Sequence, residues 1–141
     1  MTLRIAESLL ADIRRHGELA YPAECCGVLT GVTEPGKTVA RLYPVANART
    51  DDPHRYLIGP EAFQAAERAA RVEGLEVIGF FHSHPDHPAE PSGFDVAQAW
   101  PWYSYLIVRV ERGHAADLTS WVLDPEGSRM DPEPIVALSE V

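Results

Sequence analysis

The pattern of apolar and polar positions predicts two long helices in this chain. Between Leu3 and His16 apolar residues recur about every four positions, the spacing of a helix that buries one face, and Gly17 is a favourable stop. A second helix is expected to start at Pro60, because proline is tolerated in the first turn, and to end near Gly74. Each helix has one apolar face that must pack against another element.

Strand-like segments lie around these helices. Cys25–Gly31 and Thr38–Ala46 flank a Pro-Gly turn and predict a hairpin. Leu75–His82 is mostly apolar, which is typical of a central strand buried on both faces. Tyr103–Val110 and Ala115–Leu123 predict a second hairpin. This order of elements favours an α/β domain with a mixed central sheet flanked by helices.

The remaining segments are short or irregular. A proline-rich loop follows the central strand, Ser92 begins a short helix, and Pro101 ends it. Residues 124–134 carry turn signals, and a last short element is expected from Ile135. The tryptophans and tyrosines around Pro101 are expected to pack in the core, with a substrate groove as the alternative. With 141 residues, 45% of them hydrophobic, we expect residues 1–141 to form a single domain.

Charge and composition disfavour two classes of partner. The 12 basic and 21 acidic residues give a formal charge of -9, which argues against nucleic acid and offers no basic segment for a membrane surface. No stretch approaches the roughly 20 apolar residues of a membrane span, and residues 1–24 do not resemble a signal peptide. Cys25 and Cys26 are adjacent and poorly placed to form a disulfide. We therefore expect a soluble protein of the reducing cytoplasm, of unspecified oligomeric state.

The end of the central strand carries side chains that suit a metal ion. If this segment is extended, His82 and His84 project from the same face about 6–7 Å apart, and both imidazoles can reach one ion. Asp95 follows eleven positions later, where the proline-rich loop can fold it back to the same point. Two imidazoles, a carboxylate and a water make a tetrahedral zinc site with an open position, and imidazole ligands favour zinc over harder ions.

Helix capping is the competing explanation of the acidic end of this motif. Ser92 is a favoured N-cap, and Asp95 in the first turn is stabilised by the helix dipole. Taken alone, this structural explanation is sufficient for Ser92 and Asp95. The two histidines on one face favour the metal site, because a shared partner offsets the cost of burying them. His87 and Asp86 lie on the intervening loop and are expected to be solvated, with contact to a substrate as the alternative.

Hydrolysis at such a metal site also requires a proton shuttle outside the coordination sphere. Glu24 is a candidate because it precedes a strand that can neighbour Leu75–His82. Spacing alone leaves other acidic residues open. Cys25 and Cys26, whose side chains point to opposite faces of a strand, are expected to serve packing rather than chemistry.

These residues together resemble a known family signature. His82-Ser83-His84, seven residues, Ser92, two residues and Asp95 match the pattern of the JAMM (MPN+/Mov34) zinc metallopeptidases. Residues 22–27 resemble the glutamate segment of the small stand-alone prokaryotic members, and a looser similarity runs through Pro53 and Arg55 to the Pro60 helix. The resemblance implies the JAMM/MPN fold, which is similar to that of cytidine deaminase. It covers roughly residues 1–123.

The resemblance also implies an activity. One Zn²⁺ would be bound by His82, His84 and Asp95, with Glu24 hydrogen-bonded to the metal water and Ser92 stabilising the oxyanion. Similar prokaryotic members trim ubiquitin-like sulfur carriers of the ThiS or MoaD type, so the implied reaction is hydrolysis of an amide bond at a C-terminal Gly-Gly. One alternative is an isopeptidase that removes a ubiquitin-like modifier from lysine. A non-catalytic MPN-type binding module is the other, and the intact residue set speaks against it.

Overall fold

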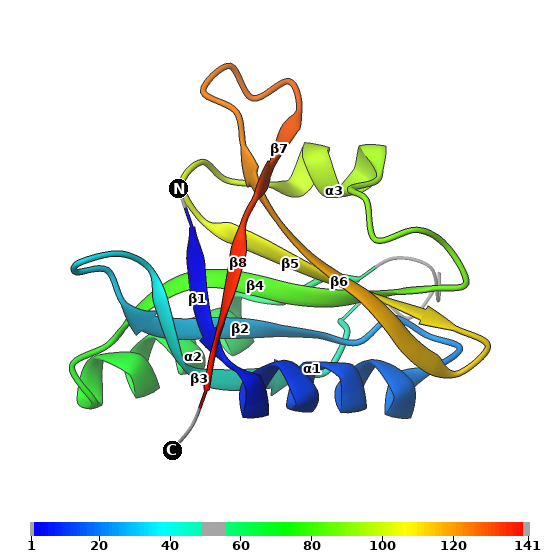
Figure 1. The fold of residues 1–141 in the computed structure, drawn as a ribbon. Helices are drawn as coiled ribbons and strands as arrows, with labels where there is room; N and C mark the ends of the chain where they lie inside the picture. The colour runs from blue at the N-terminus through cyan, green and yellow to red at the C-terminus, as the bar shows by residue number, and fades with distance from the viewer. Residues whose placement is uncertain (1, 49–55, 140–141) are drawn as a thin grey trace.

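The computed structural model describes residues 2–48 and 56–139, which build one eight-stranded mixed sheet with helices packed on it (Figure 1). The strand order is β7-β6-β5-β4-β2-β3-β1-β8. The strands are β1 (Leu3–Ala6), β2 (Cys26–Val32), β3 (Thr38–Val45), β4 (Glu76–Pro85), β5 (Ser104–Glu111), β6 (His114–Leu123), β7 (Met130–Glu133) and β8 (Ile135–Leu138). The helices in the described residues are α1 (Glu7–Ala20), α2 (Pro60–Val72) and α3 (Gly93–Gln98).

The central position of β4 follows from its apolar sequence. It pairs antiparallel with β2 and parallel with β5, and residues Val77–Pro85 are buried. The predicted hairpins are confirmed as the antiparallel pairs β2/β3 and β5/β6. A mixed sheet with helices against it agrees with the α/β fold class expected from the order of elements. The strand continues three residues past its predicted end and so includes His84.

Alternation along the central strands divides the core into two layers. Val28 and Phe80 face a cluster that includes Ala66 of α2, whereas Leu29 and Phe81 face the cluster beneath α1. Successive side chains of a strand point to opposite faces, so strands covered on both sides must be apolar at odd and even positions alike. This alternation also decides which face the polar residues at the ends of β2 and β4 occupy.

The predicted first helix was wrong at both ends. Leu3 and Ile5 are fully buried in β1, which pairs parallel with β3 and β8, and the helix starts only at Glu7. It then continues through Gly17 to Ala20. A Cβ atom at Gly17 would lie 2.9 Å from a methyl of Val110, so this glycine permits close helix-to-sheet packing rather than ending the helix.

The C-terminal segment joins the two edges of the sheet. Strand β7 pairs with β6 at one edge, and β8 pairs with β1 at the other, yet only Pro134 separates them in sequence. The two strands form the nearly continuous red run in Figure 1. The sheet therefore curls until its edges meet. The expectation that residues 124–134 are only turns missed β7, whereas the predicted element from Ile135 is present as β8.

A buried ion pair lies beneath this closure. Lys37 Nζ lies 3.8 Å from a carboxylate oxygen of Glu133, and both side chains are almost fully buried. Lys37 also donates to Ser104 Oγ and to the carbonyl of Trp102. Glu133 accepts hydrogen bonds from the hydroxyls of Ser104 (2.7 Å) and Ser120 (2.8 Å). These contacts tie the β2–β3 turn to the C-terminal segment.

Within the described residues, no helix is long and apolar enough to cross a bilayer. Pro53 and Arg55, to which the looser family similarity extends, lie outside those residues.

Candidate metal centre

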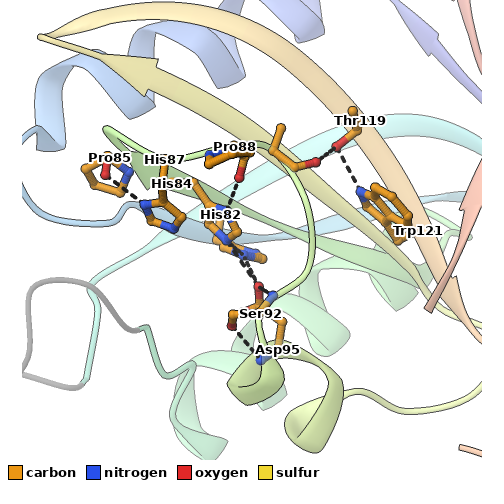
Figure 2. Close-up of polar contacts among 10 residues, drawn as sticks. His82, His84, Pro85, His87, Pro88, Ser92, Asp95, Thr119 and Trp121 are labelled. Carbon is orange, nitrogen blue, oxygen red and sulfur yellow. Dashed lines mark hydrogen bonds and ion pairs between the residues drawn. The ribbon is translucent and has the colours of Figure 1, made fainter. Parts of the chain in front are cut away.

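His82 and His84 lie on the α2 side of β4, at the end of the strand (Figure 2). Their side chains share one face because they are two positions apart in an extended strand. The two Nε2 atoms are 3.1 Å apart, and both rings are about 99% buried. The sequence-based expectation that both imidazoles reach one point is met by this geometry.

Backbone contacts set the tautomer of His84. Its Nδ1 atom lies 2.8 Å from the carbonyl oxygen of Pro88, which can only accept a hydrogen bond. Nδ1 must therefore carry the proton, and Nε2 of the neutral ring presents a lone pair. A carbonyl or carboxylate that orients the remote nitrogen in this way is the usual support of a metal-bound histidine.

On the side of its Nδ1 atom, His82 is supported by stacking rather than by a hydrogen bond. Its ring stacks on Tyr56 with centroids 4.3 Å apart, and among the described residues its Nδ1 atom has no hydrogen-bond partner. Burial lowers the pKa of His82, because the imidazolium loses its solvation, although nearby Asp95 acts in the opposite direction. Low pKa favours the neutral ring, which is the form that binds metals.

Asp95 reaches the histidines from the first turn of α3. Its Oδ2 atom lies 3.3 Å from Nε2 of His82 and 3.1 Å from Nε2 of His84. The same oxygen accepts the N–H of Ser92, while Ser92 Oγ accepts the N–H of Asp95. Burial alone would raise the pKa of Asp95, but hydrogen bonds from His82 and from the Ser92 N–H outweigh it and hold the pKa well below the ordinary value. Asp95 is therefore ionised.

The three facing atoms fit a zinc ion. Their separations of 3.1, 3.3 and 3.1 Å approach the spacing of about 3.3 Å expected between ligands of a tetrahedral ion with bonds of about 2.0–2.1 Å. His84 Nε2 presents a lone pair to a carboxylate oxygen, an arrangement that is unfavourable until a cation lies between them. The chemistry of this set, two imidazoles and one carboxylate, is that of a zinc site with an open position.

Glu24 approaches the histidines from the neighbouring strand. Cys26 pairs with His82 in the antiparallel β2/β4 ladder, so two residues further along the register Glu24 comes opposite His84. Its carboxylate lies within 4.8 Å of ring nitrogens of both His84 and His87, and the residue is 5% exposed. Spacing in the sequence did not decide which acidic residue is the proton shuttle. The structure brings Glu24 beside the candidate metal ligands.

The residues between these groups have structural roles. Ser83 faces away from the histidines, and its hydroxyl accepts the N–H of Cys25 at 2.8 Å, which fixes β2 against β4. Cys26 is buried, and its thiol contacts the carbonyl of Val45. Both cysteines are free thiols, and burial raises the pKa of Cys26 to about 12. The expectation that the cysteines pack rather than react agrees with these contacts.

His87 was expected to be a solvated loop residue, and this was wrong. It is half-buried and stacks on His84 with ring centroids 4.2 Å apart and an interplanar angle of 22°. Its Nδ1 atom lies 2.8 Å from the carbonyl oxygen of Pro85 (Figure 2). Asp86 is exposed, but it accepts hydrogen bonds from Tyr21 Oη and the Arg112 N–H. Sequence spacing gave no signal for the stacking of His87 on His84, because it depends on the turn that follows β4.

An apolar hollow of about 490 Å³ adjoins the site on the side of Tyr56. Its lining includes Phe63 of α2, Phe80 of β4 and Trp100 after α3. The aromatic residues around Pro101 therefore do not all pack in the core as expected, since Trp100 is 67% exposed. Tyr105 does pack inside, and its hydroxyl accepts the N–H of Trp100.

Comparison with known proteins identifies the family to which this sequence is similar. Residues 6–124 match the family described as prokaryotic homologues of the JAB domain. A desampylase from Haloferax volcanii is 36% identical over 102 residues, covering 72% of this chain and 73% of that protein. A probable TtuB-protein conjugate cleaving protease from Thermus thermophilus is 33% identical over 107 residues, covering 76% and 70% respectively.

The fold agrees with the same assignment. The structure of a JAB1/MPN domain protein from Archaeoglobus fulgidus superimposes with a TM-score of 0.57 at 18% identity, covering 95% of this chain and 96% of that one. The expected JAMM/MPN fold is therefore confirmed. The family match spans β2, β4 and α3, the elements that carry the candidate site. This chain belongs to the family of prokaryotic JAB-domain homologues and is a hydrolase of the JAMM type.

Proposed function

We propose that this protein is a zinc-dependent peptidase that hydrolyses the amide bond after the C-terminal Gly-Gly of a ubiquitin-like or sulfur-carrier protein. The observation that carries the zinc assignment is the triangle of ligand atoms from His82, His84 and Asp95, with sides of 3.1 to 3.3 Å. One zinc ion held by these residues would supply Lewis-acid polarisation of a water molecule and of the scissile carbonyl.

Glu24 is proposed as the proton shuttle. It lies beside His84 but approaches from the segment just before β2, whereas the three candidate ligands come from β4 and α3. A carboxylate in this position takes a proton from the attacking water and passes it to the leaving amine. The residue is only 5% exposed, which restricts the motion of its side chain beside His84.

Ser92 is proposed to stabilise the developing oxyanion. Its hydroxyl oxygen accepts the N–H of Asp95, and this leaves the hydroxyl proton available as a donor. The residue is exposed at the N-terminus of α3, next to the carboxylate that faces the histidines. A fixed donor at the point where negative charge develops lowers the barrier to amide hydrolysis.

The relatives indicate the class of substrate. The Thermus thermophilus relative is described as a probable protease that cleaves TtuB-protein conjugates. That description favours the isopeptidase variant of the proposal, in which the leaving amine belongs to a lysine of the conjugated protein. Peptidase and isopeptidase share the Gly-Gly carbonyl and differ only in the amine released. We place the reaction in the cytoplasm, where the free thiols of Cys25 and Cys26 remain reduced.

Metal analysis combined with cleavage assays tests the proposal. The purified protein is expected to hold one zinc ion and to cleave two substrates, a sulfur carrier with a short peptide after Gly-Gly and one joined to a lysine side chain. A chelator should abolish both reactions. The ratio of the two rates assigns the preferred leaving amine.

Variants separate the roles of the site residues. Glu24→Gln should retain zinc and lose cleavage, whereas Asp95→Ala and His82→Ala should lose both. Glu67→Gln, a substitution on the exposed face of α2, is the matched control and should change neither. A protein that binds no metal under any condition would contradict the peptidase assignment, and full activity of Glu24→Gln would contradict only the shuttle.

A further inference from the structure

His87 has no role in the proposed reaction, yet it forms a group with Glu24 and His84 that could hold a metal ion. One ligand atom from each of these residues lies within 4.8 Å of the others, and the group differs from the triangle that includes Asp95. His84 Nε2 already faces the first ion, and its Nδ1 donates to Pro88. The two remaining groups are the carboxylate of Glu24 and the imidazole of His87.

The backbone prepares His87 as a metal ligand in the same way as His84. The carbonyl oxygen of Pro85 accepts from Nδ1 of His87 at 2.8 Å, which leaves a lone pair on Nε2 of the neutral ring. Stacking on His84 with an interplanar angle of 22° fixes the plane of the ring. A neutral imidazole of defined tautomer close to a carboxylate matches the preferences of zinc and similar divalent ions.

The loop that carries His87 is held on both sides. Asp86 accepts hydrogen bonds from Tyr21 Oη (2.6 Å) and from the Arg112 N–H (2.7 Å). Beyond His87, the carbonyl of Ala89 accepts the hydroxyl of Thr119 at 2.7 Å. Because these contacts come from the residue after α1, the β5–β6 turn and β6, the position of His87 is set by the fold rather than by a free loop.

A second hollow reaches Glu24, although His87 is not part of its lining. Glu24 lines a hollow of about 340 Å³ on the side of α1 and β3, together with Ala20 and Pro44. This opening lies on the β2 side of the histidines, whereas the apolar hollow lies on the Tyr56 side. An ion can therefore approach Glu24 without crossing the position of the first ion.

We propose that Glu24 and His87 form a second, weaker site for a divalent cation, beside the catalytic ion, and that occupation of this site inhibits the enzyme. Two protein ligands hold an ion less firmly than three, so the second site fills only at higher zinc concentration. An ion on Glu24 occupies the carboxylate that carries the proton, and hydrolysis stops. The inhibition rests on the proposed role of Glu24; the binding of the second ion does not.

Zinc titration with matched variants tests the site. Equilibrium dialysis at controlled free zinc is expected to give two ions per chain for the wild type, one tight and one weak. His87→Phe preserves the ring that stacks on His84 but removes the ligand nitrogen, and His87→Gln removes the ring. Both variants should keep the tight ion and weaken the second by more than about tenfold. His114→Gln, at the exposed start of β6, should still bind both ions.

Activity provides the second readout. Wild-type cleavage should fall as the weak site fills, and inhibition of His87→Phe, relative to its own uninhibited rate, should require at least about tenfold more zinc. A wild type that binds a single ion up to millimolar zinc would overturn the second site, as would unchanged weak binding in both His87 variants. Weak binding that persists in Asp95→Ala, after the tight ion is lost, would support the second site. If the tight ion were missing from the wild type and the weak ion present, the zinc peptidase assignment would fail and the second site would stand.

Discussion

Ser92 and Asp95 hydrogen-bond to each other in both directions at the start of α3, and the oxygen of Asp95 that accepts the Ser92 N–H is the one that faces both histidines. Helix capping and metal binding are therefore not alternative explanations of these two residues. The capping box fixes the carboxylate with one lone pair toward the backbone and leaves the same atom directed at His82 and His84. A local structural motif thus orients a candidate metal ligand.

Substitution of Ser92 should affect stability and catalysis separately. Ser92→Ala removes the N-cap and should lower the free energy of unfolding of the metal-free protein by about 1 kcal/mol. It should also reduce kcat of the zinc-loaded enzyme about 10²-fold, because an oxyanion donor is lost. Ser92→Thr preserves both the cap and the hydroxyl and should retain most of each property. Full activity of zinc-loaded Ser92→Ala would remove Ser92 from the chemistry and leave only its cap.

The buried pair of Lys37 and Glu133 should be strongly coupled in stability. Lys37→Met leaves the carboxylate of Glu133 buried without its cation and should cost about 3–5 kcal/mol, measured by urea denaturation. The double variant Lys37→Met/Glu133→Gln removes both charges and preserves acceptors for Ser104 and Ser120, so it should recover most of this loss. Equal destabilisation by the single and the double variant would show that the charges are not coupled.

The same pair predicts a dependence of stability on alkaline pH. Burial lowers the pKa of Lys37 below its ordinary value of 10.5, although Glu133 acts in the opposite direction. Between the two pKa values the unfolded chain binds more protons than the native protein, so the free energy of unfolding contributed by Lys37 rises with pH in that window. Below the native pKa this contribution is constant.

The measurement compares the wild type with Lys37→Met/Glu133→Gln from about pH 8 to about pH 10, where lysine groups titrate. The difference in unfolding free energy between the two proteins should move in favour of the wild type as pH rises. A difference that stays constant, or moves toward the double variant, would contradict a lowered pKa for Lys37.

Gly27 should not tolerate a side chain. A Cβ atom there would lie 2.2 Å from the ring of Phe81 and 2.8 Å from the carbonyl oxygen of Tyr43. Gly27→Ala is therefore expected to lower the free energy of unfolding by about 1–3 kcal/mol, and thermal denaturation can measure the change. Gly93→Ala in the first turn of α3 is the matched control, since nothing lies within 4 Å of its Cβ position. Equal stability of the two variants would mean that Phe81 moves aside without cost.

The sequence by itself determined the local part of this site. The spacing of His82 and His84 places both on one face wherever the chain is extended, and the apolar run before them requires a buried strand. Ser92 and Asp95 form a capping box through contacts between residues three apart, so their pattern was also readable. These features depend on fixed periods and short spacings, which any fold containing the elements must respect.

Only the tertiary structure decided which distant residues join this local set. Glu24 comes opposite His84 because β2 pairs with β4 in the register Cys26↔His82, and a shift by one residue would turn its side chain to the other face. The strand at Leu3–Ala6 and the closure through β7 and β8 exist because distant strands offer them hydrogen-bond partners. His87 is stacked on His84, and its loop is held by Tyr21 after α1, by β6 and by the β5–β6 turn. Long-range pairing leaves no fixed spacing in the sequence, because it depends on the partner as much as on the segment itself.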